Sequence, residues 1–162
     1  MEFEKYILTD YEKESVTYLT NETVNFIHSN GFIFDLKVLN RKTELRKTEI
    51  YHCGEDFSTY EVLKVELASN IPDLNINLEI TPIEFNPDLN ISVNQQNFYL
   101  NINQVPDFEF ITINENKFYN VYKVNLNIND SSIIKPEQIL YNKEIGIIQI
   151  LMTNNETYTI NK

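Results

Sequence analysis

Hydrophobic and polar residues alternate with a period of two along much of the chain. Four segments show this most clearly, with apolar side chains at every second position: Phe32, Phe34, Leu36 and Val38; Leu74, Ile76, Leu78 and Ile80; Phe98, Leu100 and Ile102; and Tyr122, Val124, Leu126 and Ile128. Because successive side chains of a β-strand point to opposite faces, each segment predicts a strand with one buried and one wet face. The run from Ile145 to Met152 is apolar at both parities, which predicts a central strand covered on both faces.

Short polar turns separate these runs. Asn30-Gly31 is the clearest two-residue hairpin turn, and it would join residues 23–28 to residues 32–39. Four further turns contain asparagine: Asn94-Gln95-Gln96, Asn114-Glu115-Asn116, Asn142-Lys143 and Asn154-Asn155. The chain has only 3 glycines. Since asparagine also tolerates a positive φ, we expect it to replace glycine at turns.

These patterns predict an all-β fold. We count roughly ten to thirteen strands connected mostly as hairpins, an antiparallel meander that closes into a sandwich or a barrel. The only helix that we expect is a short one over residues 135–141. No shift in composition marks a linker, so residues 1–162 are expected to form a single domain. The predicted core comprises Phe32, Phe34, Leu36, Val62, Val65, Phe110, Tyr122, Val124, Leu126, Ile147, Ile148 and Ile150.

The composition argues against several classes of function. The 13 basic and 24 acidic residues give a net charge of −11. Binding to nucleic acid through its phosphates requires lysine and arginine, so we expect no nucleic-acid partner. Three glycines are too few for the phosphate-cradling loops of nucleotide enzymes.

Two local motifs resemble functional sites without keeping the required pattern. Positions 73–77 read Asp-x-Asn-x-Asn, like the start of a calcium loop, but Leu78 stands where such a loop needs glycine. His52 and Cys53 are adjacent on a predicted strand and point to opposite faces, so His52 cannot activate Cys53 locally. A metal site needs two or more suitably spaced ligands. We therefore expect no catalytic residue, metal or cofactor.

The charge is unevenly distributed along the chain. Positions 65–116 contain neither lysine nor arginine but hold eight acidic residues. Edge strands usually carry lysine, so this stretch is unusual for a β-protein. It is either a solvated face that favours solubility or a docking surface for a basic protein. The expected contact residues on the second interpretation are Asp73, Glu79, Glu84 and Asp88.

The last third of the chain resembles a known group of proteins. Residues 117–124 read Lys-Phe-Tyr-Asn-Val-Tyr-Lys-Val, residues 139–150 contain Tyr-Asn-Lys-Glu-Ile-Gly-Ile-Ile, and residues 155–160 read Asn-Glu-Thr-Tyr-Thr-Ile. This ending is similar to that of small lipoproteins of the Bacteroidota, although Tyr158 stands where tryptophan is common. The resemblance implies an all-β protein of the cell envelope with an N-terminal lipid anchor. It brings no catalytic residues.

The leading functional expectation is a non-enzymatic, protein-binding domain of a bacterial envelope lipoprotein, in the periplasm or at the outer membrane. The first residues show no signal peptide and no run is long enough for a membrane span, so the membrane connection would be a lost lipid anchor. A cytoplasmic location is the alternative. Two other functions stay open: an immunity or inhibitor protein that masks a basic toxin, and a carrier of a small ligand such as a lipid, if the strands enclose a cavity.

Overall fold

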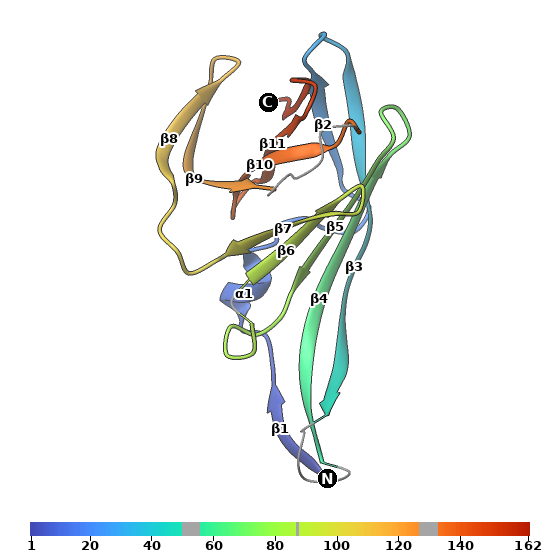
Figure 1. The fold of residues 1–162 in the computed structure, drawn as a ribbon, viewed down its shortest axis with the longest axis vertical. Coiled ribbons are helices and arrows are strands. Elements are labelled where there is room, and N and C mark those ends of the chain that lie inside the picture. The colour runs from blue at the N-terminus through green and yellow to red at the C-terminus, as the bar shows by residue number, and fades with distance from the viewer. Residues whose placement is uncertain (50–55, 87, 127–132) are drawn as a thin grey trace.

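A computed structural model describes residues 1–49, 56–86, 88–126 and 133–162 (Figure 1). Its described residues form 12 strands and one short helix. The elements are β1 Glu2–Tyr6, α1 Asp10–Glu14, β2 Thr23–His28, β3 Ile33–Glu49, β4 Phe57–Ser69, β5 Leu74–Ile80, β6 Asp88–Val93, β7 Gln96–Asn101, β8 Phe108–Ile113, β9 Asn116–Asn125, β10 Pro136–Asn142, β11 Gly146–Met152 and β12 Thr157–Ile160. The predicted all-β class and its strand number are confirmed.

The strands form one open sheet in the order β7-β6-β5-β4-β3-β2-β12-β11-β10-β9-β8. Every neighbouring pair in this path is antiparallel. Two meanders, β3 to β7 and β8 to β12, are therefore joined through β2, which pairs with both β3 and β12. Strand β1 is the exception, because it runs parallel to β4 and pairs with the part of β4 beyond the end of β5.

The two meanders share one hydrophobic core. The sheet curves so that β7 approaches β9, although β7 and β8 are the two ends of the strand order (Figure 1). Buried side chains from both meanders, such as Leu67 and Leu78 from one and Ile139 and Ile150 from the other, belong to the same cluster. We call the face of the sheet that carries this cluster the inner face.

Nine of the predicted core residues are buried: Phe34, Leu36, Val62, Val65, Tyr122, Val124, Ile147, Ile148 and Ile150. Leu126 is half-buried and packs against the core. The predictions for Phe32 and Phe110 were wrong, since these side chains are 40% and 50% exposed. Phe32 lies in the loop between β2 and β3, where it stacks on His28 with ring centroids 4.6 Å apart. Phe110 lies on the outer face of the edge strand β8.

Asparagine does occupy the positive-φ positions of turns. Asn94, Asn114 and Asn155 have φ values of +46°, +48° and +66°. The hairpin at Asn30-Gly31 is also present and joins the two predicted segments, with Ser29 as the third residue of the loop. The His28 N–H donates to the Phe32 carbonyl at 2.9 Å, which closes a three-residue loop with Gly31 at φ +99°.

The helix prediction was wrong in two ways: the helix expected over residues 135–141 is absent, and a helix that was not expected forms near the N-terminus. Residues 136–142 form strand β10, which is hydrogen-bonded to β9 on one side and β11 on the other, and pairing to two strands overrides a weak helical pattern. The helix that does form is α1, preceded by Thr9. The Thr9 side chain accepts from the Glu12 amide, and the Glu12 carboxylate accepts from the Thr9 amide, which is a capping box. The Thr-x-x-Glu spacing is visible in the sequence.

The chain leaving α1 is buried against the inner face of the sheet. In residues 15–18, which we call the inner segment, Ser15, Val16 and Tyr18 are buried. The Tyr18 hydroxyl accepts a hydrogen bond of 2.7 Å from the Ile147 amide on β11. Gly146 leaves room for this ring, because a Cβ atom there would overlap with the Tyr18 hydroxyl oxygen.

We therefore expect Gly146→Ala to destabilise the protein far more than Gly31→Ala. Both glycines have a positive φ, so each alanine carries a backbone cost of about 1 kcal/mol. A methyl group at Gly31 would meet no atom of the described residues within 4 Å, whereas one at Gly146 must displace the Tyr18 ring, which adds about 2 kcal/mol or more. Urea unfolding of the two variants measures the difference. Equal losses would show that Tyr18 does not fix the position of β11.

Candidate functional site

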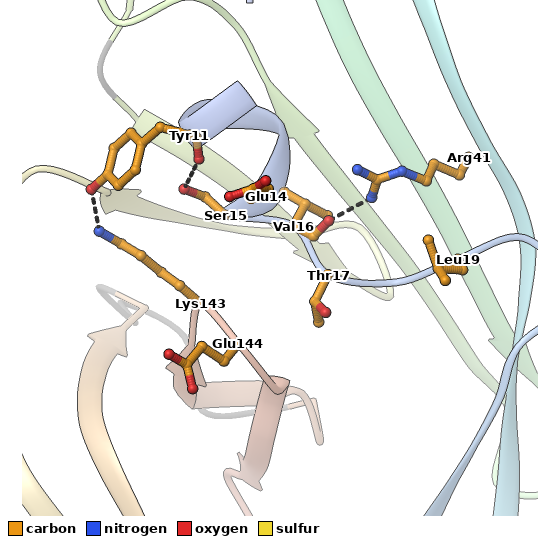
Figure 2. A pocket seen from close by; sticks show the side chains of 9 residues that line it. All are labelled: Tyr11, Glu14, Ser15, Val16, Thr17, Leu19, Arg41, Lys143 and Glu144. Carbon is orange, nitrogen blue, oxygen red and sulfur yellow. Dashed lines mark hydrogen bonds between the residues drawn. The ribbon is translucent and has the colours of Figure 1, made fainter. Parts of the chain in front are cut away.

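A cleft with a volume of about 480 Å³ lies beside the inner segment (Figure 2). Helix α1 and the inner segment form one wall, and β3 and the β10–β11 turn supply the others. The lining residues are Tyr11, Glu14, Ser15, Val16, Thr17, Leu19, Arg41, Lys143 and Glu144. The cleft therefore combines residues that are far apart in the sequence.

Arg41 on β3 holds the backbone that forms this wall. Its guanidinium donates to the carbonyl oxygens of Val16 and of Tyr18, the latter at 3.0 Å, and to the Lys13 carbonyl at 3.0 Å. Burial lowers the pKa of the Arg41 guanidinium, but arginine stays charged at neutral pH. In the described part of the chain no carboxylate lies within 4.0 Å of it, so its partners are these carbonyl dipoles.

Lys143, in the turn between β10 and β11, closes the opposite side of the cleft. Its ammonium group donates to the Ile102 carbonyl, just beyond β7, and to the Tyr11 hydroxyl at 2.7 Å (Figure 2). It also lies 5.0 Å and 5.3 Å from the ring centroids of Tyr11 and Tyr122. Lys143 thus ties the end of β7 to α1 and to the β10–β11 turn.

Two buried tyrosines complete the attachment of the inner segment. The Tyr141 hydroxyl on β10 donates to the Ser15 carbonyl at 2.6 Å. Burial raises the pKa of Tyr18 and of Tyr141, so both hydroxyls are protonated at neutral pH. They act as fixed hydrogen-bonding groups and are poorly suited to act as bases.

Several polar groups that line the cleft are bonded within the protein itself. The lining of the cleft contains no histidine or cysteine among the described residues, and the Ser15 hydroxyl donates to the Tyr11 carbonyl at 2.9 Å. Arg41 and Lys143 are both engaged by carbonyl groups of the protein itself. Within the ranges that the structure describes, no group of three acidic, histidine or cysteine side chains could hold a metal.

A lipid carrier of the barrel type would need an empty interior. Here Val16 and Tyr18 are buried against the inner face, in the same cluster as the strand residues. The inner segment therefore occupies part of the space on the inner face.

Three of the four acidic residues expected to contact a partner lie near the same end of β5, and Asp73 lies at its other end. Asp73 precedes β5 and Glu84 follows it, so they lie at opposite ends of this strand. Asp88 begins β6, opposite Asn101 of β7. Glu79, the last residue but one of β5, accepts from both terminal nitrogens of Arg46 at 2.8 and 3.2 Å, so its charge is locally balanced. Glu79 pairs with Asn90 of β6, so Glu79 and Asp88 are diagonal neighbours on adjacent strands, and Asp73 alone is remote from the others.

Of the two motifs that resembled a calcium loop and a histidine–cysteine pair, the structure describes the first. Asn75 and Asn77, from the segment that resembles a calcium loop, lie on the exposed face of β5, as the strand interpretation predicts. His52 and Cys53 lie outside the described residues.

The β8–β9 hairpin carries a surface that the sequence interpretation missed. Phe110 and Tyr119 are opposite each other in the register, with ring centroids 6.3 Å apart, and they are 50% and 54% exposed. The Lys117 ammonium lies 3.9 Å from the centroid of the Phe110 ring and 5.0 Å from that of Tyr119. Phe108, on the same side of β8 as Phe110, is 37% exposed. We call these four residues the hairpin surface.

Alternation alone could not reveal this surface. Residues 108–113 read Phe-Glu-Phe-Ile-Thr-Ile, and the two phenylalanines suggest a buried face. In the structure the other parity is the inner one, since Ile111 and Ile113 pack against the core. The one clue in the sequence was the position of this strand at the end of a lysine-free stretch.

We expect Arg41→Met to lower the free energy of unfolding by about 3 kcal/mol, because three part-buried backbone carbonyls lose a charged donor. Arg46→Met is the matched control. Arg46 is also half-buried, but its partners Glu44 and Glu79 are side chains near the surface, so we expect a loss below about 1 kcal/mol. Chemical denaturation measures both. A small loss for Arg41→Met would show that the inner segment does not depend on it.

We expect Tyr141→Phe to alter stability in a way that depends on pH. Losing the hydrogen bond to Ser15 costs about 1 kcal/mol at pH 7. Tyrosine in an unfolded chain ionises near pH 10 and the folded pKa of Tyr141 is higher, so the stability from its burial is complete below about pH 10 and falls above it. Tyr141→Phe should therefore lose stability less steeply above pH 10. Unfolding curves at several alkaline pH values test this, and identical slopes would contradict it.

Comparison with known protein families, with curated proteins and with solved structures found no match to this chain. Among the described residues, no helix has the length and apolar character needed to cross a membrane.

Proposed function

We propose that the protein is a non-enzymatic, protein-binding domain and that the hairpin surface is its contact surface. The observation that carries this proposal is the exposed aromatic group formed by Phe108, Phe110 and Tyr119 on an edge hairpin. Aromatic side chains are enriched at protein interfaces and among the residues that dominate binding energy.

The hairpin surface is well suited to binding because it is already ordered. Phe110 and Tyr119 face each other across two paired strands, and Lys117 lies over both rings. The β8–β9 turn is tight, with Asn114 and Glu115 both at positive φ. Side chains held in one arrangement lose little conformational entropy on binding, so more of the contact energy contributes to affinity.

The charges beside the hairpin surface favour a basic partner. Asp107, Glu109 and Glu115 are exposed along β8 and at its two ends, and Lys117 is the nearest cation after them in the sequence. This assigns the docking role to a different part of the lysine-free stretch from Asp73, Glu79, Glu84 and Asp88. Acidic groups on the same edge hairpin as the aromatic residues would speed association with a basic protein and add specificity.

The proposed location is the bacterial cell envelope. Its support is the similarity of residues 117–124, 139–150 and 155–160 to the ending of Bacteroidota lipoproteins. The first of these segments lies within β9 and so contributes Lys117 and Tyr119 to the hairpin surface. A binding role at the envelope is consistent with a contact surface in this part of the chain.

Site-specific photo-cross-linking in cells of the producing organism tests the proposal. A photoreactive amino acid at position 110 or 119 should give a discrete adduct with one protein, because both side chains would be inside the interface. Position 99 is the matched control, since Tyr99 is 59% exposed but lies on β7 outside the hairpin surface. It should give no such adduct.

A second variant tests whether the contact is energetically important. The double change Phe110→Ser and Tyr119→Ser should reduce recovery of the identified partner at least tenfold, while Tyr99→Ser leaves it unchanged. All three side chains are about half exposed, so unfolding temperatures should stay close to that of the original protein. Equal cross-linking at positions 99 and 110, or equal recovery with both variants, would contradict the proposal.

A further inference from the structure

Strand β8 presents an unpaired sheet edge. It is the last strand of the path and, among the described residues, pairs with β9 alone. Its register with β9 runs from Phe108 to Ile113 without a bulge. In an antiparallel pair, residues alternate between those bonded to the neighbour and those whose N–H and C=O point away from it. Half of the backbone groups of β8 therefore point outward along the free edge.

This edge lacks most features that prevent strand pairing. Residues 108–113 contain no proline and no lysine, and four of these six residues are phenylalanine or isoleucine. The other end of the sheet differs, because β7 is approached by β9. The one charged residue within β8 is Glu109, which is exposed.

We infer that a segment of the partner adds to β8 as a further strand, and that this segment alternates apolar and basic residues. This inference rests on the proposed protein-binding function and specifies its mode. Strand addition supplies backbone hydrogen bonds for affinity, while side chains at alternate positions supply specificity.

The two faces of β8 determine the pattern of the partner. Phe108 and Phe110 lie on the outer face, so apolar side chains of the added strand would cover them. Glu109 lies on the other face, where a cation of the added strand would pair with it. Asp107 and Glu115, at the two ends of β8, extend this preference for positive charge.

The same charges select against a second copy of this chain. Pairing β8 with β8 would bring Asp107, Glu109 and Glu115 of two molecules together, each with a net charge of −11. Like charges on adjacent strands are destabilising. Glu109 thus disfavours self-association while it favours a basic strand.

Binding of capped synthetic peptides to the full chain tests the inference. The probe is a short peptide that alternates valine and lysine, and its control alternates valine and glutamate. Two further controls keep the lysine and valine side chains but carry N-methyl groups on alternate backbone amides. One control is methylated at the amides of the valines, and the other at those of the lysines. We expect the lysine peptide to bind and the glutamate peptide not to bind. One of the two N-methylated peptides should bind at least tenfold more weakly, because its methyl groups block the backbone hydrogen bonds to β8.

Variants of the chain locate the site. Glu109→Lys should weaken binding of the lysine peptide at least tenfold, whereas Asp73→Lys, an equal change of charge in the same lysine-free stretch but before β5, should leave it nearly unchanged. Both side chains are exposed, so both variants should fold. Amide hydrogen exchange should show new protection at alternate residues of β8 in the complex.

Several results would overturn strand addition. They are failure of the lysine peptide to bind, equal binding of every N-methylated form, equal weakening by Asp73→Lys and Glu109→Lys, or dimerisation through β8 in sedimentation experiments. If the peptide fails but position 110 still cross-links to a partner, protein binding stands and only its mode is wrong. If neither is observed, both proposals are wrong.

Discussion

The arrangement of this protein depends on hydrogen bonds from side chains to the backbone carbonyls around the inner segment. A buried chain outside the sheet has no strand to satisfy its polar groups, so donors must come from elsewhere. Arg41 supplies them for residues 13, 16 and 18, and Tyr141 supplies one for residue 15. These donors lie on β3 and β10, one in each meander. The same set of contacts fills the interior and fixes the two halves of the sheet relative to each other.

The strands could be predicted because their pattern is local. Alternation defines one buried face, and asparagine at turns compensates for the shortage of glycine, so strand number and antiparallel order were accessible. The inner segment could not be predicted, since its burial is determined by residues such as Arg41 and Gly146 that are distant in sequence. Residues 136–142 show the same limit. Their helical pattern is weak, and pairing with strands on both sides decides their conformation.

The acidic charge around the candidate site could be predicted from the sequence, but the position of the site could not. A lysine-free acidic stretch is visible in the sequence, but its acidic residues alternate along strands whose order cannot be deduced locally. Glu79 is balanced by Arg46, an arginine 33 residues away, whereas Glu109 has no cation within 4.0 Å among the described residues. Phe110 illustrates the complementary problem. An aromatic residue at an alternating position indicates a core, but in the folded sheet Ile111 and Ile113 take the inner face of β8 and Phe110 points outward.

The pairing of β2 with β12 has a consequence for how the molecule forms. All other neighbours in this strand order are consecutive along the chain and can meet by closing shorter loops. His28 and Tyr158 are opposite each other although they are 158 − 28 = 130 positions apart. The entropy lost in closing such a long loop is recovered only after contacts on both sides exist. We therefore expect each meander to assemble from its own hairpins first and the two meanders to join across β2 and β12 afterwards.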